Sequence, residues 1–560
     1  MYQQRSLPLR GAVALVLCTI LSPALRARMT CSQVHDQSVG GAAPVGTSGT
    51  SADTTGAPLF RYVPPSQFDG LFRVDIHNVR DHISPEGYAG AVAAAESRTH
   101  PNYFRNWIRD AAEAYQVMFN LYLQGDLNWS PDEILKLMTD YFDFTQKITK
   151  IHPRGFPLVN MDGSAIEESE WGWPQNCGPA LRASSFVTAE KVMQKIFDEG
   201  HLDKEKLPLF RERIFDLVAA DVAYTATQWQ ENTFDSWEEV KSKRHFFTLM
   251  VQRRALLEGA RLARRMGKLD KKQQWEQVAN QISEVLRTDE NFSKDLIEAT
   301  SGRSGGIVKP ALYDMSVILG VLLGKVKGQS YGVDEPRVIA TLWNLEKTFE
   351  RILPINHNRP KGNGVMFSRW EGDGWTGFKR DAPGSAHFWF LTTFAASEFY
   401  YDLAETYREK KSVVIDARTI SAFESILQEY TPGPGEPNVA LQANQELQGK
   451  ELQVLISALR EHGDGIMKTL NYHRYQDGPR AGQMGEQGDK WKGEVTGPER
   501  LTWSHVNAIR AFLARRKLVA ALWQEAEEER LKAEKGTRLN AAAAAAAAVT
   551  QEENRQKVGE

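Results

Sequence analysis

Apolar residues recur along most of the chain at spacings of three and four positions, which predicts helices rather than strands. One example is the run Phe246, Leu249, Leu256 and Ala260, which is followed by Gly267 at the position of a C-terminal cap. The same pattern predicts helices over 104–124, 132–148, 179–198, 208–228, 245–266, 270–287, 311–324, 335–352, 387–408, 416–429, 449–468 and 502–516. A shorter helix is expected near 85–96, and no strong run of alternating β-branched residues competes with these helices.

About twelve antiparallel helices can close into a ring of six inner and six outer helices. Each inner helix would bury most of its circumference, and each outer helix one stripe. A helical solenoid is the alternative, but the sequence has no fixed period to support it. Long loops rich in Trp, Gly, Asp and Glu precede residues 104, 179, 245 and 387. We therefore expect a binding site at one end of the ring.

The composition changes on both sides of this helical body. Residues 1–27 combine basic residues with a short apolar run and small residues, which is typical of a secretory signal peptide; a chance apolar start and an uncleaved anchor are the alternatives. Residues 28–60 carry few large apolar groups and are expected to form a disordered linker. The helical body is expected over 61–520 and a charged, Ala-rich tail over 521–560. We expect a secreted protein, or one of a lysosome- or vacuole-like compartment, with no membrane span in the mature chain.

The overall balance is that of an ordinary globular protein, for which we expect a monomer. The 560 residues are 42% hydrophobic and 25% charged, with a net charge of −3, which argues against nucleic acid as a partner. The three cysteines, Cys18, Cys31 and Cys177, do not form a disulfide framework, and a Cys31–Cys177 bond is not expected. Asn291 and Asn128 begin glycosylation sequons, the second weakened by a following proline.

Four segments concentrate the aromatic and charged residues that could carry chemistry. They are Tyr103-Phe104-Arg105-Asn106-Trp107-Ile108-Arg109-Asp110, Trp171 to Ala183, Asp235-Ser236-Trp237-Glu238-Glu239-Val240, and Gly485-Glu486-Gln487 followed by Leu501-Thr502-Trp503-Ser504. Taken alone, the carboxylates are explained by exposed helix starts or loops, and Arg109 and Asp110 by a helix cap. Any one segment alone is weak evidence of a functional site, but the presence of all of them in this order along the chain is specific evidence.

Together these segments resemble the glucoamylase family, glycoside hydrolase family 15, over about residues 84–516. The resemblance implies an all-α, (α/α)6 barrel, which agrees with the helix pattern. It also implies an inverting, exo-acting hydrolase that releases glucose from the non-reducing ends of α-1,4-glucans such as starch, glycogen or maltooligosaccharides. No cofactor and no metal are expected, since no metal cluster or phosphate-binding loop is evident.

The resemblance also assigns roles to individual residues. Breaking an acetal by inversion needs one protonated and one ionised carboxyl group, and here Glu238 would be the general acid and Glu486 the general base. An acid that holds its proton near working pH predicts a bell-shaped rate profile with an acidic optimum. The substrate-binding residues implied are Tyr103, Trp107, Arg109, Asp110, Trp171, Glu239, Arg369 and Asp373. For Arg369 and Asp373 a plain charged turn is the competing interpretation.

Three features depart from the family pattern or from the expected topology. Cys177 stands where the family usually has Asp, and the loop 374–384 looks longer than usual. Glu486 breaks the rule that motif segments precede alternate helices, although the linker 469–500 is long enough to cross a barrel. The alternatives are therefore an enzyme of the same family acting on trehalose or dextran-type linkages, and a non-catalytic sugar-binding or regulatory barrel.

Overall fold

Six helices form a closed inner ring in the computed structural model, which describes residues 66–166, 171–433 and 435–558. The signal peptide and linker predicted for 1–27 and 28–60 lie outside these residues. The inner helices are α4 (Ile108–Gln124), α6 (Cys177–Asp198), α8 (Phe246–Arg265), α10 (Ser316–Gly324), α12 (Phe390–Lys410) and α15 (Thr502–Val558). Each packs against the next, and α15 closes the ring by packing against α4.

Outer helices alternate with the inner ones along the chain. They are α3 (Ser66–His82), α5 (Pro131–Ile151), α7 (Lys206–Gln228), α9 (Leu269–Thr288), α11 (Pro336–Ile352) and α14 (Gly449–Tyr472). Outer helix α9 buries only four side chains, at spacings of three and four, whereas inner helix α10 is buried at every position. A short helix, α13 (Ile420–Glu429), is additional to the twelve. This arrangement confirms the predicted (α/α)6 barrel.

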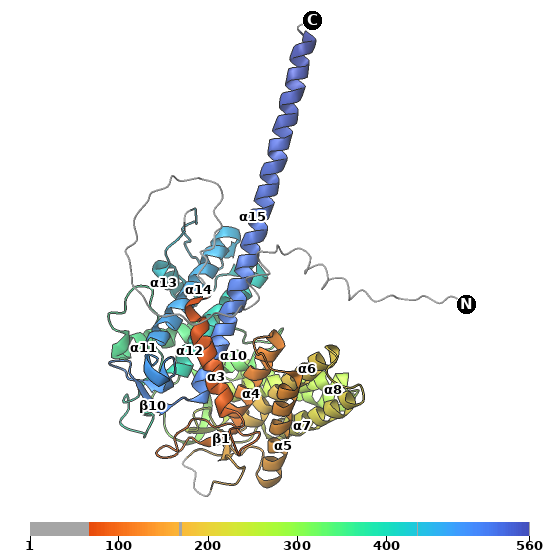
Figure 1. The fold of residues 1–560 in the computed structure, drawn as a ribbon. Coiled ribbons are helices and arrows are strands. Elements are labelled where there is room, and N and C mark those ends of the chain that lie inside the picture. Colours follow the sequence, from red (N-terminus) through yellow and green to blue (C-terminus); the bar gives the residue numbers. More distant parts are fainter. Residues whose placement is uncertain (1–65, 167–170, 434, 559–560) are drawn as a thin grey trace, which may run out of the picture. The chain divides into compact units, whose positions relative to one another are not determined.

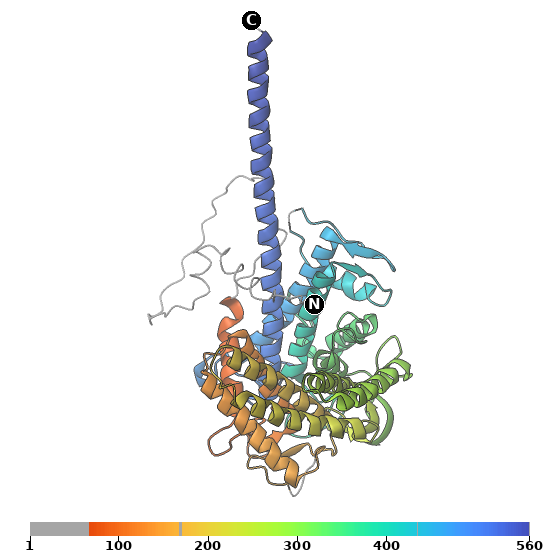
Figure 2. The same ribbon diagram turned by 90° about the vertical axis from the view of Figure 1, so that its right-hand side faces the viewer.

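The predicted helix near 85–96 is wrong, and the helix α3 before it was missed. Pro85 opens a run of turns in which Gly87 and Gly90 have φ of 85° and 80°, a conformation that breaks a helix. The pattern of α3 was obscured because its buried face carries Asp75, which accepts two hydrogen bonds from Arg474 at 2.7 and 3.0 Å. Figure 1 and Figure 2 show α3, in red, running beside α15, in blue.

Short antiparallel strands, rather than the longer helices predicted, precede several inner helices. Residues 105–107 form β1, which pairs with β2 (Leu158–Asn160) before α4 begins. Ahead of α8 lie β3 (Thr233–Phe234) and β4 (Val240–His245). They form a three-stranded sheet with β5 (Thr300–Gly306), which lies ahead of α10. A second three-stranded sheet joins β6 (Phe388–Trp389), β9 (Gly485–Gly488) and β10 (Val495–Glu499); β7 (Ser412–Val414) pairs with β8 (Glu446–Gln448).

The last inner helix, α15, continues from the barrel into the charged, Ala-rich segment without a break. From Trp523 to Thr550 none of its side chains is buried, so this part has no apolar core of its own. None of the described helices is long and apolar enough to cross a membrane.

A buried charge cluster ties α6 to α7. Asp221 of α7 is fully buried and accepts two hydrogen bonds, each 2.7 Å long, from Arg182 of α6. Arg154, from the loop after α5, donates a third at 2.5 Å. Two positive charges are therefore compensated inside the protein by a single carboxylate.

We predict that Asp221→Ala lowers the free energy of unfolding by about 3–5 kcal/mol, because it leaves Arg182 buried without its partner. Urea denaturation followed by circular dichroism measures the change. The control is Asp203→Ala, which removes an exposed ion pair with Lys206 and should change stability by less than about 1 kcal/mol. Equal effects of the two substitutions would contradict this account of the cluster.

Candidate active site

The motif segments meet in one pocket at the N-terminal ends of the inner helices. Its lining residues are Ala94, Tyr103, Trp107, Arg109, Asp110, Trp171, Ser236, Trp237, Glu238, Glu239, Arg369, Trp375, Trp389, Glu486, Leu501 and Trp503. With α3 as the first outer helix and α13 as an addition, Glu486 precedes the inner helix α15. In the sequence analysis Glu486 broke the rule that motif segments precede alternate helices, because α13 was counted among the twelve barrel helices and α3 was missed.

Glu238 lies in the tight turn between β3 and β4, and the carboxylate of Asp235 holds this turn. Asp235 accepts backbone N–H groups of Glu239 at 2.8 Å and Val240 at 3.1 Å. Glu238 itself has φ of 67°, a left-handed conformation that costs a non-glycine residue about 1–2 kcal/mol. Lys309 donates to Asp235 at 2.8 Å and, against the effect of burial, helps to hold the pKa of that carboxyl below its usual range. The hydrogen bonds and the ion pair of Asp235 therefore hold the turn in a backbone conformation that its own residues do not favour.

The carboxyl group of Glu238 is buried beside a guanidinium group. Burial raises its pKa to about 7, while Arg109 and Gln175 oppose the rise and Asp110 adds to it. Arg109 donates to Glu238 Oε1 at 3.2 Å and lies 3.3 Å from Asp110. Burial disfavours the charge of Arg109, but these two carboxylates raise its pKa above the ordinary range. Arg109, Asp110 and Glu238 therefore form one buried charged group on the pocket wall.

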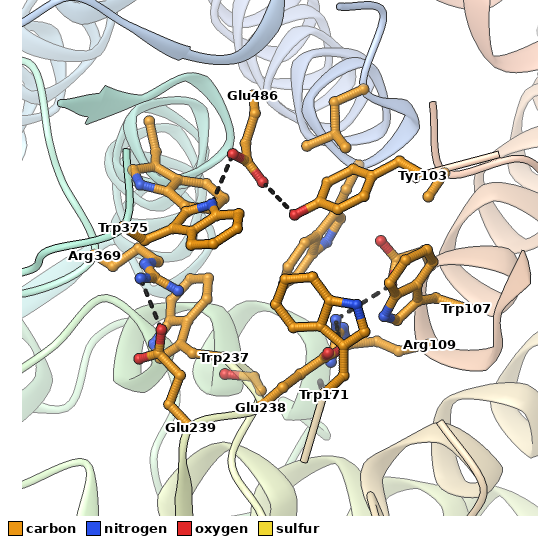
Figure 3. Close-up of a pocket in the computed structure, with 16 residues that line it drawn as sticks. Tyr103, Trp107, Arg109, Trp171, Trp237, Glu238, Glu239, Arg369, Trp375 and Glu486 are labelled. Carbon is orange, nitrogen blue, oxygen red and sulfur yellow. Dashed lines mark hydrogen bonds and ion pairs between the residues drawn. The ribbon is translucent and has the colours of Figure 1, made fainter. Parts of the chain in front are cut away.

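Glu486, on β9, faces the pocket from the other side (Figure 3). Tyr103 donates its hydroxyl to Oε1 at 3.1 Å, and Trp375 donates its indole N–H to Oε2 at 2.9 Å. Burial raises the pKa of Glu486 to about 7, and the two donors and Arg369 oppose the rise. Glu238 and Glu486 therefore have similar pKa values, so their chemical roles must follow from their positions.

A second charged group lies around Glu239 and Arg369. Arg369 donates to Glu239 at 3.0 Å and makes a two-bond contact, 2.7 Å each, with Asp373. Arg380 forms an ion pair with the same oxygen of Glu239. Of the substrate-binding residues predicted from the sequence, Asp373 alone does not line the pocket; it lies behind Arg369 and orients it.

Aromatic rings form most of the remaining wall. Tyr103, Trp107 and Trp171 contact one another edge to face, with ring centroids 5.3–6.2 Å apart, and Trp171 contacts Trp375 in the same way. The guanidinium of Arg109 lies over the ring of Trp503 at 4.5 Å. These rings lower the polarity around the charged groups of the pocket, which strengthens the electrostatic interactions of those groups.

Cys177 is a free, fully buried thiol at the first residue of α6. Burial raises its pKa to about 11, although Arg109 opposes this rise. The thiol is therefore uncharged at neutral pH. It does not line the pocket, but it lies behind the Arg109–Glu238 pair that does.

Sequence reasoning missed several pocket residues, above all Trp375. Trp375 follows Asp373 by two positions in a glycine-rich loop, and a lone tryptophan there carried no signal of a contact with Glu486. Trp503 lies in a recognised segment but was not assigned to the site, and Trp389 lies outside these segments. Among the described residues, no group of three or more His, Cys, Asp or Glu side chains is arranged to hold a metal ion.

Comparison with known proteins places the chain in a group of related enzymes. It is 28% identical to Glucoamylase 1 of Rhizopus oryzae over 79% of the chain and 69% of that protein. It is 25% identical to the intracellular sporulation-specific glucoamylase of Saccharomyces cerevisiae over 81% of the chain and 84% of that protein. Among solved structures, the glucoamylase of Saccharomycopsis fibuligera shares the fold with a TM-score of 0.67 and 21% identity, covering 83% of the chain and 98% of that protein.

The family model of glycosyl hydrolases family 15 matches residues 76–513, from α3 through the part of α15 that closes the inner ring. This range contains every residue of the pocket. The chain therefore belongs to glycosyl hydrolases family 15.

Proposed function

We propose that this protein is an exo-acting, inverting glucoamylase that hydrolyses glucose from the non-reducing ends of α-1,4-glucans. The observation that carries the proposal is the pair of buried carboxyl groups, Glu238 and Glu486, on facing walls of one pocket. Family membership and the glucoamylase names of the relatives support the substrate class.

In the proposed reaction Glu238 acts as general acid and Glu486 as general base. Glu238 gives its proton to the glycosidic oxygen, and the bond between that oxygen and C1 breaks. A water molecule on the other face of the sugar attacks C1 and loses a proton to Glu486. The two groups thus exchange protonation states in each turnover, and solvent restores them after glucose leaves.

The remaining charged groups would bind sugar hydroxyls. Arg109 and Asp110, next to Glu238, are proposed to hold the terminal glucose through charge-assisted hydrogen bonds. Glu239 and Arg369 are proposed to bind the sugar on the leaving-group side. One oxygen of Glu239, Oε2, is buried and accepts no hydrogen bond from the protein, so it is available to a hydroxyl group. The rings of Tyr103, Trp107 and Trp171 would limit access of water.

Action on trehalose or on dextran-type linkages is the alternative within the family, and no contact among the described residues favours it. A non-catalytic sugar-binding barrel is the alternative outside it. The chain has a glutamate at both proposed catalytic positions, 238 and 486, which favours an enzyme. The monomeric state and the secreted or lysosome- or vacuole-like location stay predictions of the sequence.

Replacement of each carboxyl group separates the two roles. We predict that Glu238→Gln and Glu486→Gln each lower kcat on maltotriose by about 10²–10⁴-fold. Fluoride leaves without full protonation, so Glu238→Gln should keep α-glucosyl fluoride hydrolysis within about tenfold of wild type, whereas Glu486→Gln should lose it. Glucose release assayed by coupled oxidation measures both.

The matched control is Glu371→Gln, an exposed carboxylate whose removal should leave both rates unchanged. Equal glucose release by wild type, Glu238→Gln and Glu486→Gln would contradict the assignment. Absence of hydrolysis in all three, with maltose binding retained, would favour the sugar-binding barrel.

The pH profile follows from the two raised pKa values. Activity should fall as pH rises through about 7, because Glu238 loses its proton, and fall as pH drops through about 7, because Glu486 gains one. We therefore predict a narrow bell in kcat/KM centred near pH 7 rather than the acidic optimum expected from sequence alone. Initial rates on maltotriose from pH 4 to 9 test this. A rate that keeps climbing to pH 9 would contradict it.

Cys177→Asp should move the basic limb of this profile to higher pH. A carboxylate behind Arg109 would compete with Glu238 for the guanidinium and repel the ionised form of Glu238, and both effects raise the Glu238 pKa. Cys177→Ser, which adds no charge, is the control and should leave the limb in place. An unchanged basic limb in a folded Cys177→Asp variant would show that position 177 has no electrostatic effect on Glu238.

A further inference from the structure

We propose that Trp375 is a positioning residue for the general base, and that its indole N–H aims the carboxylate of Glu486 at the attacking water. The inference rests on the proposed function, in which Glu486 accepts a proton from that water. It concerns a residue outside the recognised motifs, in the glycine-rich loop that follows Asp373.

The first observation is how completely the Glu486 carboxylate is held. Trp375 donates to Oε2 at 2.9 Å and Tyr103 donates to Oε1 at 3.1 Å, so each oxygen has one donor. A carboxylate oxygen can accept two hydrogen bonds, so an acceptor position remains for water. Two donors on different oxygens prevent rotation of the group, which one donor alone would permit.

The second observation is that Trp375 is itself fixed on both sides. Its backbone N–H donates to Asp373 Oδ1 at 2.9 Å, and Asp373 is held in turn by Arg369. Its carbonyl oxygen accepts from Gln487 Nε2 at 3.1 Å, and Gln487 is the residue next to the base. Trp375 is only 7% exposed, so the indole has little freedom to move away.

The third observation is a glycine contact that brings this loop close to β10, the strand that pairs with the strand of the base. Gly377 and Gly497 both have positive φ, 86° and 77°. A Cβ atom on Gly377 would lie 2.6 Å from the Cα of Gly497 and 3.3 Å from Oε2 of Glu486. Any side chain at position 377 would therefore displace the loop or the base, and the short Trp375 contact depends on this approach.

The chemical consequence concerns the ionised form of the base. A buried carboxyl tends to hold its proton, and a protonated Glu486 cannot activate water. A hydrogen bond donated to the carboxylate favours its ionised form. Trp375 thus opposes the effect of burial and keeps the base both oriented and ready to accept a proton. A tryptophan that served only as a wall for the sugar would affect neither property.

The test removes the indole N–H of Trp375 in two variants, one of which keeps a fused bicyclic ring. In one variant benzothienylalanine, which has sulfur in place of the indole N–H, is incorporated at position 375; the other is Trp375→Phe. For both we expect kcat/KM on maltotriose to fall about 10–100-fold, with KM changed by less than about threefold. The acidic limb of the pH profile should move up by about one pH unit. Trp491→Phe, at an exposed tryptophan in the β9–β10 turn, is the control and should leave rate and profile unchanged.

A readout independent of turnover separates this proposal from the proposed function. ¹³C NMR of protein labelled at the Glu carboxyl groups, with Glu486→Gln to assign the resonance, follows the Glu486 pKa directly. A higher pKa in both position-375 variants supports the positioning role even if wild type releases no glucose from any glucan. An unchanged Glu486 pKa and acidic limb in the benzothienylalanine variant would overturn the proposal.

Discussion

Removing two carboxyl groups from water is the constraint on which the rest of the site depends. Glu238 and Glu486 are almost fully buried, and burial is the largest influence on the pKa of each. An isolated buried carboxylate is costly, so each is surrounded by donors: Arg109 for Glu238, Tyr103 and Trp375 for Glu486. These contacts oppose the effect of burial on both pKa values, and the proposed reaction needs one group protonated and the other ionised.

The barrel supplies this environment through its connectivity. The segments that form the pocket come ahead of α4, α6, α8, α12 and α15, so residues far apart in the sequence meet at one end of the inner ring. That end presents the N-termini of the inner helices, whose dipoles favour negative charge. A packed ring of helices holds short strands and turns in place, including the left-handed turn at Glu238, which would not be stable alone.

The helical body and most of the pocket were predictable from the sequence because both depend on local patterns. The spacing of apolar residues located twelve of the thirteen described α-helices. The ordered motifs gave Glu238, Glu486 and several of the other residues that line the pocket. The helix α3 was missed because a buried ion pair, Asp75 with Arg474, replaces apolar residues on its inner face. Trp375 was missed for a related reason. Its contact with Glu486 joins positions 111 residues apart, and such a contact does not affect the spacing of apolar residues along the sequence.

In the proposed reaction, water and leaving group occupy opposite faces of the same sugar, between Glu238 and Glu486. The most direct measurement is ¹H NMR of the anomeric protons during the first minutes of maltotriose hydrolysis, before mutarotation mixes the products. Inversion at C1 predicts that β-glucose forms first and that α-glucose appears only by mutarotation. If α-glucose forms first, the substitution retains configuration, and a water-activating role for Glu486 opposite the acid at 238 is contradicted.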